Sequence, residues 1–203
     1  MLISRLAGWR FDSNWGHRTK GAIRAATALL LLVPVLASCH RAGSVVAAGG
    51  QTRLQLTSTS FREGRIPRVY TCDGNDTSPE LAWSAPPAAT KSFALIAIDP
   101  DAPMGTFVHW VLYNLPPSAR ELPEGMPKQG QFADGTKQGQ NDFPRTGYGG
   151  PCPPRSSTHR YIFVLYALDT MLDLPAGATR AQIEESIKGH IVAHGELAAR
   201  YSR

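Results

Sequence analysis

The stretch Ser92–Pro103 reads SFALIAIDPDAP, and it decides the fold because seven small or apolar residues run without a break into Asp99. A run of this length is short for a helix, and it ends at two acids that alternate with prolines. Two further runs, Phe107–Tyr113 and Tyr161–Leu168, have a similar length and the same β-branched and aromatic character. Together they predict central strands that are covered on both faces.

The segments around these runs complete a mainly β pattern. Leu54–Thr59 alternates apolar and polar residues, and 191–201 does the same, so each predicts a half-buried strand. Residues 115–145 are rich in Pro, Gly and Gln without any period, which predicts a long surface excursion. A capping box of Thr179 with Gln182 predicts one short helix near the C-terminus, where we expect one or two.

Composition agrees with a turn-rich β domain and excludes one class of partner. The 203 residues include 16 Pro and 19 Gly, and the formal net charge is +5. Residues 1–38 hold five basic side chains and one acidic side chain, so the rest of the chain is almost neutral. We therefore expect no nucleic-acid partner.

Residues 1–38 are typical of a lipoprotein signal peptide. A basic region precedes the apolar run Ala25–Ala37, which is too short to span a bilayer well. The following Leu36-Ala37-Ser38-Cys39 resembles the lipobox of bacterial lipoproteins, in which the cysteine becomes the lipidated first residue. An ordinary signal peptide and an uncleaved anchor are the alternatives. The stretch from Met1 to Gly16 is long for such a peptide and carries Trp9, Phe11 and Trp15, which leaves open a translation start further downstream.

The expected domain organisation follows from this leader. Residues 1–38 would be removed, 39–53 would form a flexible Gly/Ala/Ser-rich tether, and 54–203 would form one domain. Lipidation of Cys39 would anchor the protein in the cell envelope, facing the periplasm. His40 in place of an aspartate after the cysteine favours the outer membrane by resemblance to the usual sorting rule.

The two remaining cysteines are Cys72 and Cys152. An exported protein is in an oxidising compartment, where two thiols can form a disulfide. Such a bond would close a loop of 80 residues, a constraint worth about 4 kcal/mol in the chain-entropy model. Two buried free thiols are the alternative.

A set of polar residues lies beside rigid Pro/Gly turns at the ends of the predicted strands. It comprises two carboxylates, two imidazoles and a phenol: Asp99, Asp101, His109, His159 and Tyr161. Polar side chains held by stiff loops at strand ends line small polar pockets. For His109 taken alone, the alternative to a pocket residue is a buried core histidine satisfied by one hydrogen bond.

Three kinds of site compete for this set. A metal site has suitable ligand types, but no local pair of ligands exists and Pro100 stiffens the segment between the acids. A catalytic site has less support. The sequence contains no nucleophile elbow of the Gly-x-Ser-x-Gly type, and Asp99 and Asp101 are too close in sequence to flank a sugar as a glycosidase pair does. Cys152 with His159 could imitate a thiol triad, yet a disulfide explains that cysteine more simply.

The third kind, an anion-binding pocket, fits best. The pair Gly149–Gly150 would let backbone amides face a ligand, and a charged imidazole would meet an oxyanion. Asp99 and Asp101, on one side of an extended segment, would orient the histidines and raise the imidazole pKa.

These residues carry a resemblance to a known family. The motifs are Asp99–Pro103, His109–Trp110, Gly147–Pro154, His159–Tyr161, Thr71–Gly74, Ser78–Trp83 and Tyr201–Arg203. Together they resemble the phosphatidylethanolamine-binding proteins, in particular the bacterial branch called Raf kinase inhibitor-like, over about residues 54–203. In one departure, 153–159 reads PPRSSTH where that branch usually has PPSGTH, so the loop here is one residue longer and lacks the glycine.

The resemblance implies two packed antiparallel sheets and a pocket for phosphate or phosphoethanolamine head groups. Carried over by motif, its residues are Asp99, Asp101, His109, Gly150, Pro151, Cys152, Pro153, His159 and Tyr161. We expect non-catalytic binding of a small anionic ligand or a phospholipid head group, without cofactor or metal. The alternative is an inhibitor of a serine protease or a kinase that acts through the same pocket and its rim.

Overall fold

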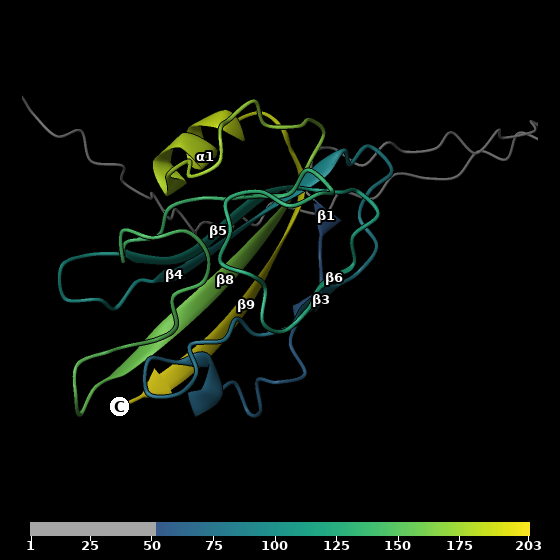
Figure 1. Ribbon diagram of the computed structural model, residues 1–203. Coiled ribbons are helices and arrows are strands. Elements are labelled where there is room, and N and C mark those ends of the chain that lie inside the picture. Colours follow the sequence, from purple (N-terminus) through teal and green to yellow (C-terminus); the bar gives the residue numbers. More distant parts are fainter. Residues whose placement is uncertain (1–51) are drawn as a thin grey trace, which may run out of the picture. The chain divides into compact units, whose positions relative to one another are not determined.

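The structure is a computed structural model that describes residues 52–203. The predicted signal peptide, the lipidation site Cys39 and most of the predicted tether lie outside these residues. Two sheets make up the described part (Figure 1). The larger sheet has the strand order β1 (Thr52–Arg53), β9 (Ile191–Ser202), β8 (Thr158–Leu168), β4 (Ser92–Asp99), β5 (Phe107–Leu115) and β7 (Lys137–Gln138). The smaller sheet has the order β2 (Leu56–Thr57), β3 (Leu81–Trp83) and β6 (Glu121–Leu122).

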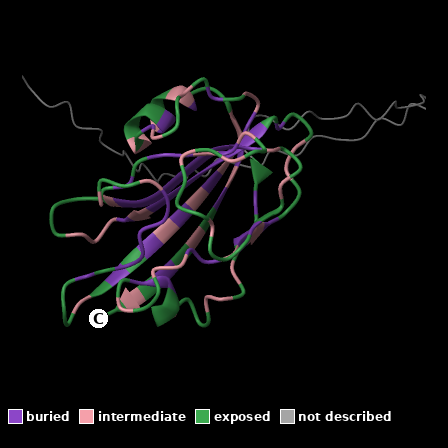
Figure 2. Ribbon diagram, in the orientation of Figure 1, coloured by how far each residue is buried: buried purple, intermediate pink, exposed green. Residues whose placement is uncertain are grey.

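The long strands β4 and β5 are covered on both faces, as their apolar runs predict. The same prediction for β8 is wrong, because one of its faces is partly exposed along most of the strand. One core lies between the sheets and includes Phe93 and Trp110 of the large sheet with Leu81 of the small one. A second core lies on the opposite face, where Ile96 and Val111 pack with Ile183 of the helix. Figure 2 shows β8 as alternating bands of buried and partly exposed residues, the pattern of a strand with two unlike faces.

Local sequence signals place the C-terminal elements. Helix α1 (Arg180–Ser186) begins at the predicted capping box, in which Thr179 and Gln182 exchange hydrogen bonds. Strand β9 pairs antiparallel with β8 along almost its whole length, as the alternating tail predicts. One further helical turn, the 3-10 helix η1 (Arg68–Tyr70), lies in the N-terminal part. The predicted excursion 115–145 contains the short strands β6 and β7.

Two residues of the predicted tether belong to the large sheet. Thr52 and Arg53, placed in the tether by sequence, form β1 and pair in parallel with Ala193 and His194 of β9. All other pairings between the named strands are antiparallel. The predicted strand Leu54–Thr59 is correspondingly shorter, because only Leu56 and Thr57 pair within the small sheet.

The two cysteines form a disulfide. The Sγ atoms of Cys72 and Cys152 are bonded, and the Cα atoms are 5.4 Å apart. The bond joins the segment after η1 to the loop before β8, two segments 80 residues apart in sequence. The alternative of two free thiols is therefore wrong for this structure.

Candidate functional site

A bulge in β5 gives His109 its position. Ala97 of β4 pairs with Trp110, but the next residue, Ile98, pairs with Val108, so His109 is an extra residue in the ladder. A β-bulge of this kind turns one side chain away from the regular alternation of the strand. The backbone of His109 is held from the other side by the Gly149 amide, which donates to its carbonyl at 2.9 Å.

The imidazole of His109 is buried and fixed in one orientation. Its Nδ1 lies 2.6 Å from the carbonyl oxygen of Gly149, and because a carbonyl only accepts, Nδ1 carries the proton. The ring also contacts Phe107, Phe143 and Tyr161, with centroids 5.1 to 5.5 Å away. The atom left for a ligand is Nε2, on the far side of the ring.

The electrostatics of His109 differ from the expectation that its pKa is raised. Burial lowers its pKa below the ordinary value of 6.5, and the hydrogen bond to Gly149 and the charge of Asp99 oppose that effect only in part. His109 is therefore a neutral imidazole near pH 7 when no ligand is present, with a lone pair on Nε2.

Asp99 and His159 form a second buried pair beside His109. The Nδ1 atom of His159 lies 2.7 Å from Oδ2 of Asp99, and both side chains are less than a tenth exposed. The other oxygen, Oδ1, accepts the backbone N–H of Asp101 at 2.8 Å. The carboxylate thus holds the imidazole in one orientation and leaves Nε2 of His159 for a ligand.

Asp101 does not belong to this group, contrary to prediction. Its carboxylate binds Arg160 through two side-chain hydrogen bonds of 2.6 and 2.9 Å. The hydrogen bonds from Arg160 hold the pKa of Asp101 well below its usual range. The alternation rule fails here because Pro100 begins a turn, and strand geometry ends at Asp99.

Tyr161 lies beneath His109 and does not line the cavity itself. The phenol ring packs edge-on against the imidazole, and its hydroxyl is buried with no hydrogen-bond partner among the described residues. Burial and the nearby Asp99 carboxylate raise the pKa of Tyr161 far above its ordinary value, so the hydroxyl keeps its proton. A buried donor without a partner is rare in folded proteins and commonly marks a site completed by a ligand or water.

The loop that contains Gly149 and Gly150 lies behind the site. The prediction that its backbone amides face a ligand is wrong. The N–H of Gly150 donates to Oδ1 of Asp76 at 2.6 Å, and that of Gly149 donates to His109. A Cβ at Gly150 would lie 2.4 Å from the carbonyl oxygen of Tyr70, so only glycine fits there. Pro151 is also buried behind the site, with its carbonyl accepting the N–H of Cys72.

Asp76 is a positioning residue that the sequence did not single out. Its Oδ1 holds the Gly150 amide, and its Oδ2 pairs with Lys128 at 2.7 Å and with Arg145 at 2.9 Å. Three distant segments therefore meet at one carboxylate. An aspartate in a turn cluster such as Thr71–Asp76 is too common to be recognised from sequence alone.

A cavity of about 700 Å³ opens in front of the two histidines. Of the predicted residues, Asp99, His109, Cys152, Pro153 and His159 line it. Its walls are mostly apolar and include Phe107, Phe143, Pro103, Met104 and Pro154. Arg203 adds a cationic group at the wall, although it also pairs with Asp73 at 3.1 Å. The aromatic walls and Arg203 were missed, because their distance from the histidines in sequence hides their role.

Two further observations concern residues 52–203 alone. No group of three or more His, Cys, Asp or Glu side chains in this part of the chain is arranged to hold a metal ion. No helix within the same residues has the length and apolar character needed to cross a membrane.

The two sheets and the recessed histidine site define a β domain with one deep cavity at the end of its central strands. Residues 57–202 match the family described as phosphatidylethanolamine-binding protein. The chain belongs to this family, which confirms the resemblance carried by the separate motifs.

Two relatives of similar sequence are matched over nearly their whole length. A UPF0098 protein of Aquifex aeolicus is 50% identical over 160 residues, which cover 77% of this chain and 92% of that protein. The UPF0098 protein YbhB of Escherichia coli is 40% identical, over 73% of this chain and 100% of its own length.

Solved structures agree in fold. The crystal structure of a putative phosphatidylethanolamine-binding protein homolog, CT736 from Chlamydia trachomatis, has a TM-score of 0.68 at 41% identity and covers 75% of this chain and 99% of its own. Escherichia coli YbcL, described as a new member of the mammalian PEBP family, has a TM-score of 0.69 at 31% identity with the same coverage.

Proposed function

We propose that the protein binds small phosphorylated or other anionic ligands in the histidine cavity without catalysing a reaction. The observation that carries the proposal is the arrangement of two buried imidazoles. Each has its Nδ1 engaged, one by the Gly149 carbonyl and one by Asp99, so both Nε2 atoms are left for a guest in the cavity. An imidazole that carries a proton on Nε2 provides a charged hydrogen bond to an oxyanion.

The wall composition supports a ligand with an anionic head and an apolar body. Phe107, Phe143 and the prolines form much of the lining. The polar part comprises the two histidines with Asp99, Thr106, Asp142 and Arg203. A phospholipid, whose phosphate head group is joined to apolar acyl chains, combines these features.

The lining offers no activated nucleophile, which supports binding without catalysis. Its cysteine, Cys152, is engaged in the disulfide, and the hydroxyl among the described residues that line the cavity, that of Thr106, forms no hydrogen bond to either histidine. The pair of Asp99 and His159 resembles the base half of a catalytic triad, but a base needs a hydroxyl or thiol within reach.

The proposal also includes the location of the protein. The lipobox-like sequence before Cys39 supports lipidation there, so the domain would be tethered to a membrane of the cell envelope and face the periplasm. The outer membrane is favoured by His40 in the position after the cysteine.

Titration with inorganic phosphate and with phosphoethanolamine tests the binding proposal. Each of the variants His109→Ala and His159→Ala is expected to weaken both ligands at least about tenfold, the cost of one charged hydrogen bond. His190→Ala removes a histidine that pairs with Asp169 and does not line the cavity, so its affinity should stay within about twofold of the wild type.

Asp101→Asn is a second control, because this acid lies two residues from Asp99 but binds Arg160 outside the cavity. Unchanged affinity in both histidine variants would refute the site. Inhibition of a serine protease by the wild type, lost in His109→Ala while neither ligand binds, would favour the inhibitor alternative instead.

A further inference from the structure

Four arginines lie in a row on the exposed side of the large sheet. Arg160 of β8 pairs with Arg200 of β9, and Arg200 forms a parallel bridge with Arg65. Arg65 in turn forms an antiparallel bridge with Arg62 across a tight turn. Bridge partners project from the same face of a sheet, so the four side chains leave the surface together.

The buried neighbours of these residues identify the face. Tyr161, Ala199 and Ile66, each next to one of the arginines in sequence, are buried in the core between the two sheets. Because side chains alternate along a strand, the arginines project to the opposite, outer face. All four are exposed. We call this set, Arg62, Arg65, Arg160 and Arg200, the arginine row.

The arginine row carries uncompensated positive charge. Arg160 is balanced by Asp101, but no ion pair forms at Arg62, Arg65 or Arg200 within residues 52–203. Like charges on directly opposed residues of neighbouring strands destabilise a sheet. The body of the protein is almost neutral, whereas here four arginines stand against two nearby acidic residues, Glu63 and Asp101. The excess of positive charge is therefore local to the row.

The surface between the arginines is shaped and polar. Arg65 and Arg200 line a hollow of about 420 Å³ together with the hydroxyl residues Thr158 and Ser202 and one acidic residue, Glu63. Those two hydroxyls are hydrogen-bonded to each other at 2.8 Å and can also accept or donate to a guest. Arginine forks beside hydroxyl groups are well suited to phosphate oxygens.

We propose that the arginine row docks on the phosphate groups of an anionic lipid bilayer. Neighbouring strands lie about 4.8 Å apart, so the row extends over roughly 14 Å and meets more than one phosphate at a time. A flat surface that displays many phosphates satisfies such a row better than one small ion does. The proposal concerns a different surface from the histidine cavity and does not depend on the ligand bound there.

Two other features favour a lipid surface over a nucleic acid or an acidic protein. Met104, in the loop that follows Asp101, is fully exposed at 101% and lies at the same end of the sheet as Arg160. An apolar side chain beside arginines suits the boundary of head groups and acyl chains. If Cys39 is lipidated, the 13 residues from there to Thr52 can extend up to about 45 Å, enough for the domain to reach the bilayer.

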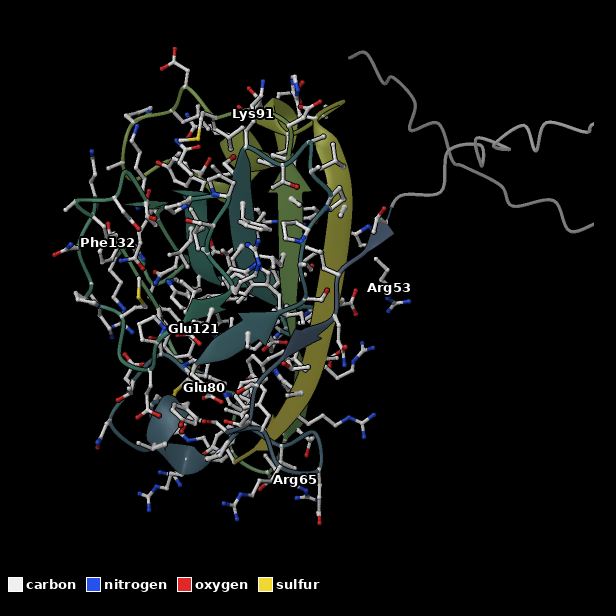
Figure 3. The ribbon with its side chains drawn as sticks, turned by 90° about the vertical axis from the view of Figure 1, so that its right-hand side faces the viewer. Arg53, Arg65, Glu80, Lys91, Glu121 and Phe132 are labelled. Carbon is white, nitrogen blue, oxygen red and sulfur yellow. A yellow bond between two sulfur atoms is a disulfide. The ribbon has the colours of Figure 1, made fainter. Side chains whose placement is uncertain are left out.

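Vesicle binding by residues 40–203 tests this proposal. The relatives that are matched over nearly their whole length indicate that this part folds by itself. Co-sedimentation is measured with phosphatidylcholine vesicles and with vesicles that also contain phosphatidylglycerol. The wild type is compared with Arg65→Gln/Arg200→Gln and with the control Arg53→Gln/Lys91→Gln, which removes the same charge elsewhere. Figure 3 shows Arg65 at the lower end of the molecule and Lys91 at the upper end.

The wild type should bind only the anionic vesicles, and added salt should weaken that binding. Arg65→Gln/Arg200→Gln should lower the affinity at least about tenfold, since each arginine near an anionic surface contributes roughly fivefold. The control and His109→Ala should stay within about twofold. Equal binding to neutral vesicles, equal loss in the control, or binding to an oligonucleotide but not to vesicles would overturn the proposal. Phosphate affinity in solution should be unchanged in the arginine variant, which separates this test from that of the histidine cavity.

Discussion

At the residue scale, the state of the proton on His109 governs the chemistry of the cavity. Burial lowers the pKa of this imidazole, while the Gly149 carbonyl fixes which nitrogen holds the proton. The empty site therefore presents an acceptor at Nε2. An anion needs a donor at that position, so binding must be coupled to the uptake of a proton.

This coupling predicts a pH dependence of binding. An anion stabilises charged His109 and so raises its pKa in the complex. At any pH between the lowered pKa of the free protein and the raised pKa of the complex, binding is accompanied by the uptake of a proton. Affinity must then fall as pH rises through that window, by up to about tenfold per pH unit. Sulfate is the suitable probe because its own charge is constant from about pH 5 to about pH 9.

Calorimetry in two buffers of different ionisation enthalpy measures the proton uptake directly. The expected result is a net uptake in the wild type that decreases in His109→Ala. Sulfate affinity that is constant over the whole range would contradict the role given to the imidazole.

Residue-level prediction succeeded where strand ends were involved and failed where turns were. Asp99, His109 and His159 were grouped correctly, because each adjoins or lies within a long apolar strand that is recognisable from sequence. Asp101 was misplaced because the turn at Pro100 reverses the direction of its side chain. The glycine amides were misassigned because their partners lie far away in sequence: Asp76 is 74 residues from Gly150, and His109 is 40 residues from Gly149.

At the element scale, one carboxylate ties the segment after β2 to the start of β3. Oε1 of Glu80 accepts hydrogen bonds from the Thr59 hydroxyl at 2.7 Å and from the Ser60 amide at 2.8 Å. Burial raises the pKa of Glu80, but these hydrogen bonds and those from the Ser60 and Ser58 hydroxyls outweigh it and lower the pKa to about 2. Figure 3 labels Glu80 in the lower half of the view.

We expect Glu80→Gln to destabilise the domain by about 1–2 kcal/mol at neutral pH, because hydrogen bonds to a charged acceptor become bonds to a neutral one. The folded pKa lies below the ordinary value of 4.5, so the contribution is complete above about pH 4.5 and is lost as pH falls towards 2. Urea unfolding at several pH values measures this. If the free energy of unfolding of Glu80→Gln decreased on acidification as much as that of the wild type, another group would be responsible for the pH dependence.

The disulfide joins two loops that the strands alone would leave separate. Reduction should destabilise residues 40–203 by about 4 kcal/mol in the chain-entropy model, because the loop it closes is long. Urea unfolding with and without a phosphine reductant measures the difference. The variant Cys72→Ser/Cys152→Ser should be insensitive to the reductant.

Detection of two free thiols in the denatured, unreduced protein would contradict the bond. Cys152 also lines the cavity, so the same samples allow phosphate affinity to be compared with and without the bond.

Strands and helix were predictable for different reasons. The helix and its first residue follow from a local capping box, Thr179 with Gln182. The central strands follow from uninterrupted apolar runs. The bulge at His109 was not predictable, because it is a mismatch between two strands, and nothing in β5 alone reveals which residue its neighbour skips. The two-residue strands β6 and β7 were missed for the same reason: pairing partners define them.

At the scale of the whole molecule, charge and burial divide the domain into distinct surfaces. The cores on the two faces of the large sheet leave the ends of its strands for the histidine cavity. The arginine row lies on the outer face at the same end, where Asp101 links it to the loop that lines the cavity. The sequence reveals the near-neutral balance of the domain, but only strand pairing reveals that four arginines are adjacent.

Lipidation of Cys39 is the prediction that concerns the whole chain. When the full sequence is expressed in a bacterium, metabolic labelling with palmitate should mark the wild type and not Cys39→Ser. Detergent should be needed to release the labelled protein from the membrane fraction, since each methylene that an acyl chain buries in the bilayer contributes about 0.8 kcal/mol to membrane affinity. Labelling that persists in Cys39→Ser would place the anchor elsewhere, and absence of labelling in both would leave an ordinary signal peptide or an uncleaved one.

The most direct test of the central claim is a crystal structure of residues 40–203 grown in saturating phosphate. We predict tetrahedral density in the cavity, with phosphate oxygens about 2.7–3.2 Å from Nε2 of both His109 and His159. An empty cavity with phosphate bound only at the arginine row, or a divalent cation between the histidines, would contradict the claim that the two imidazoles together hold an anion.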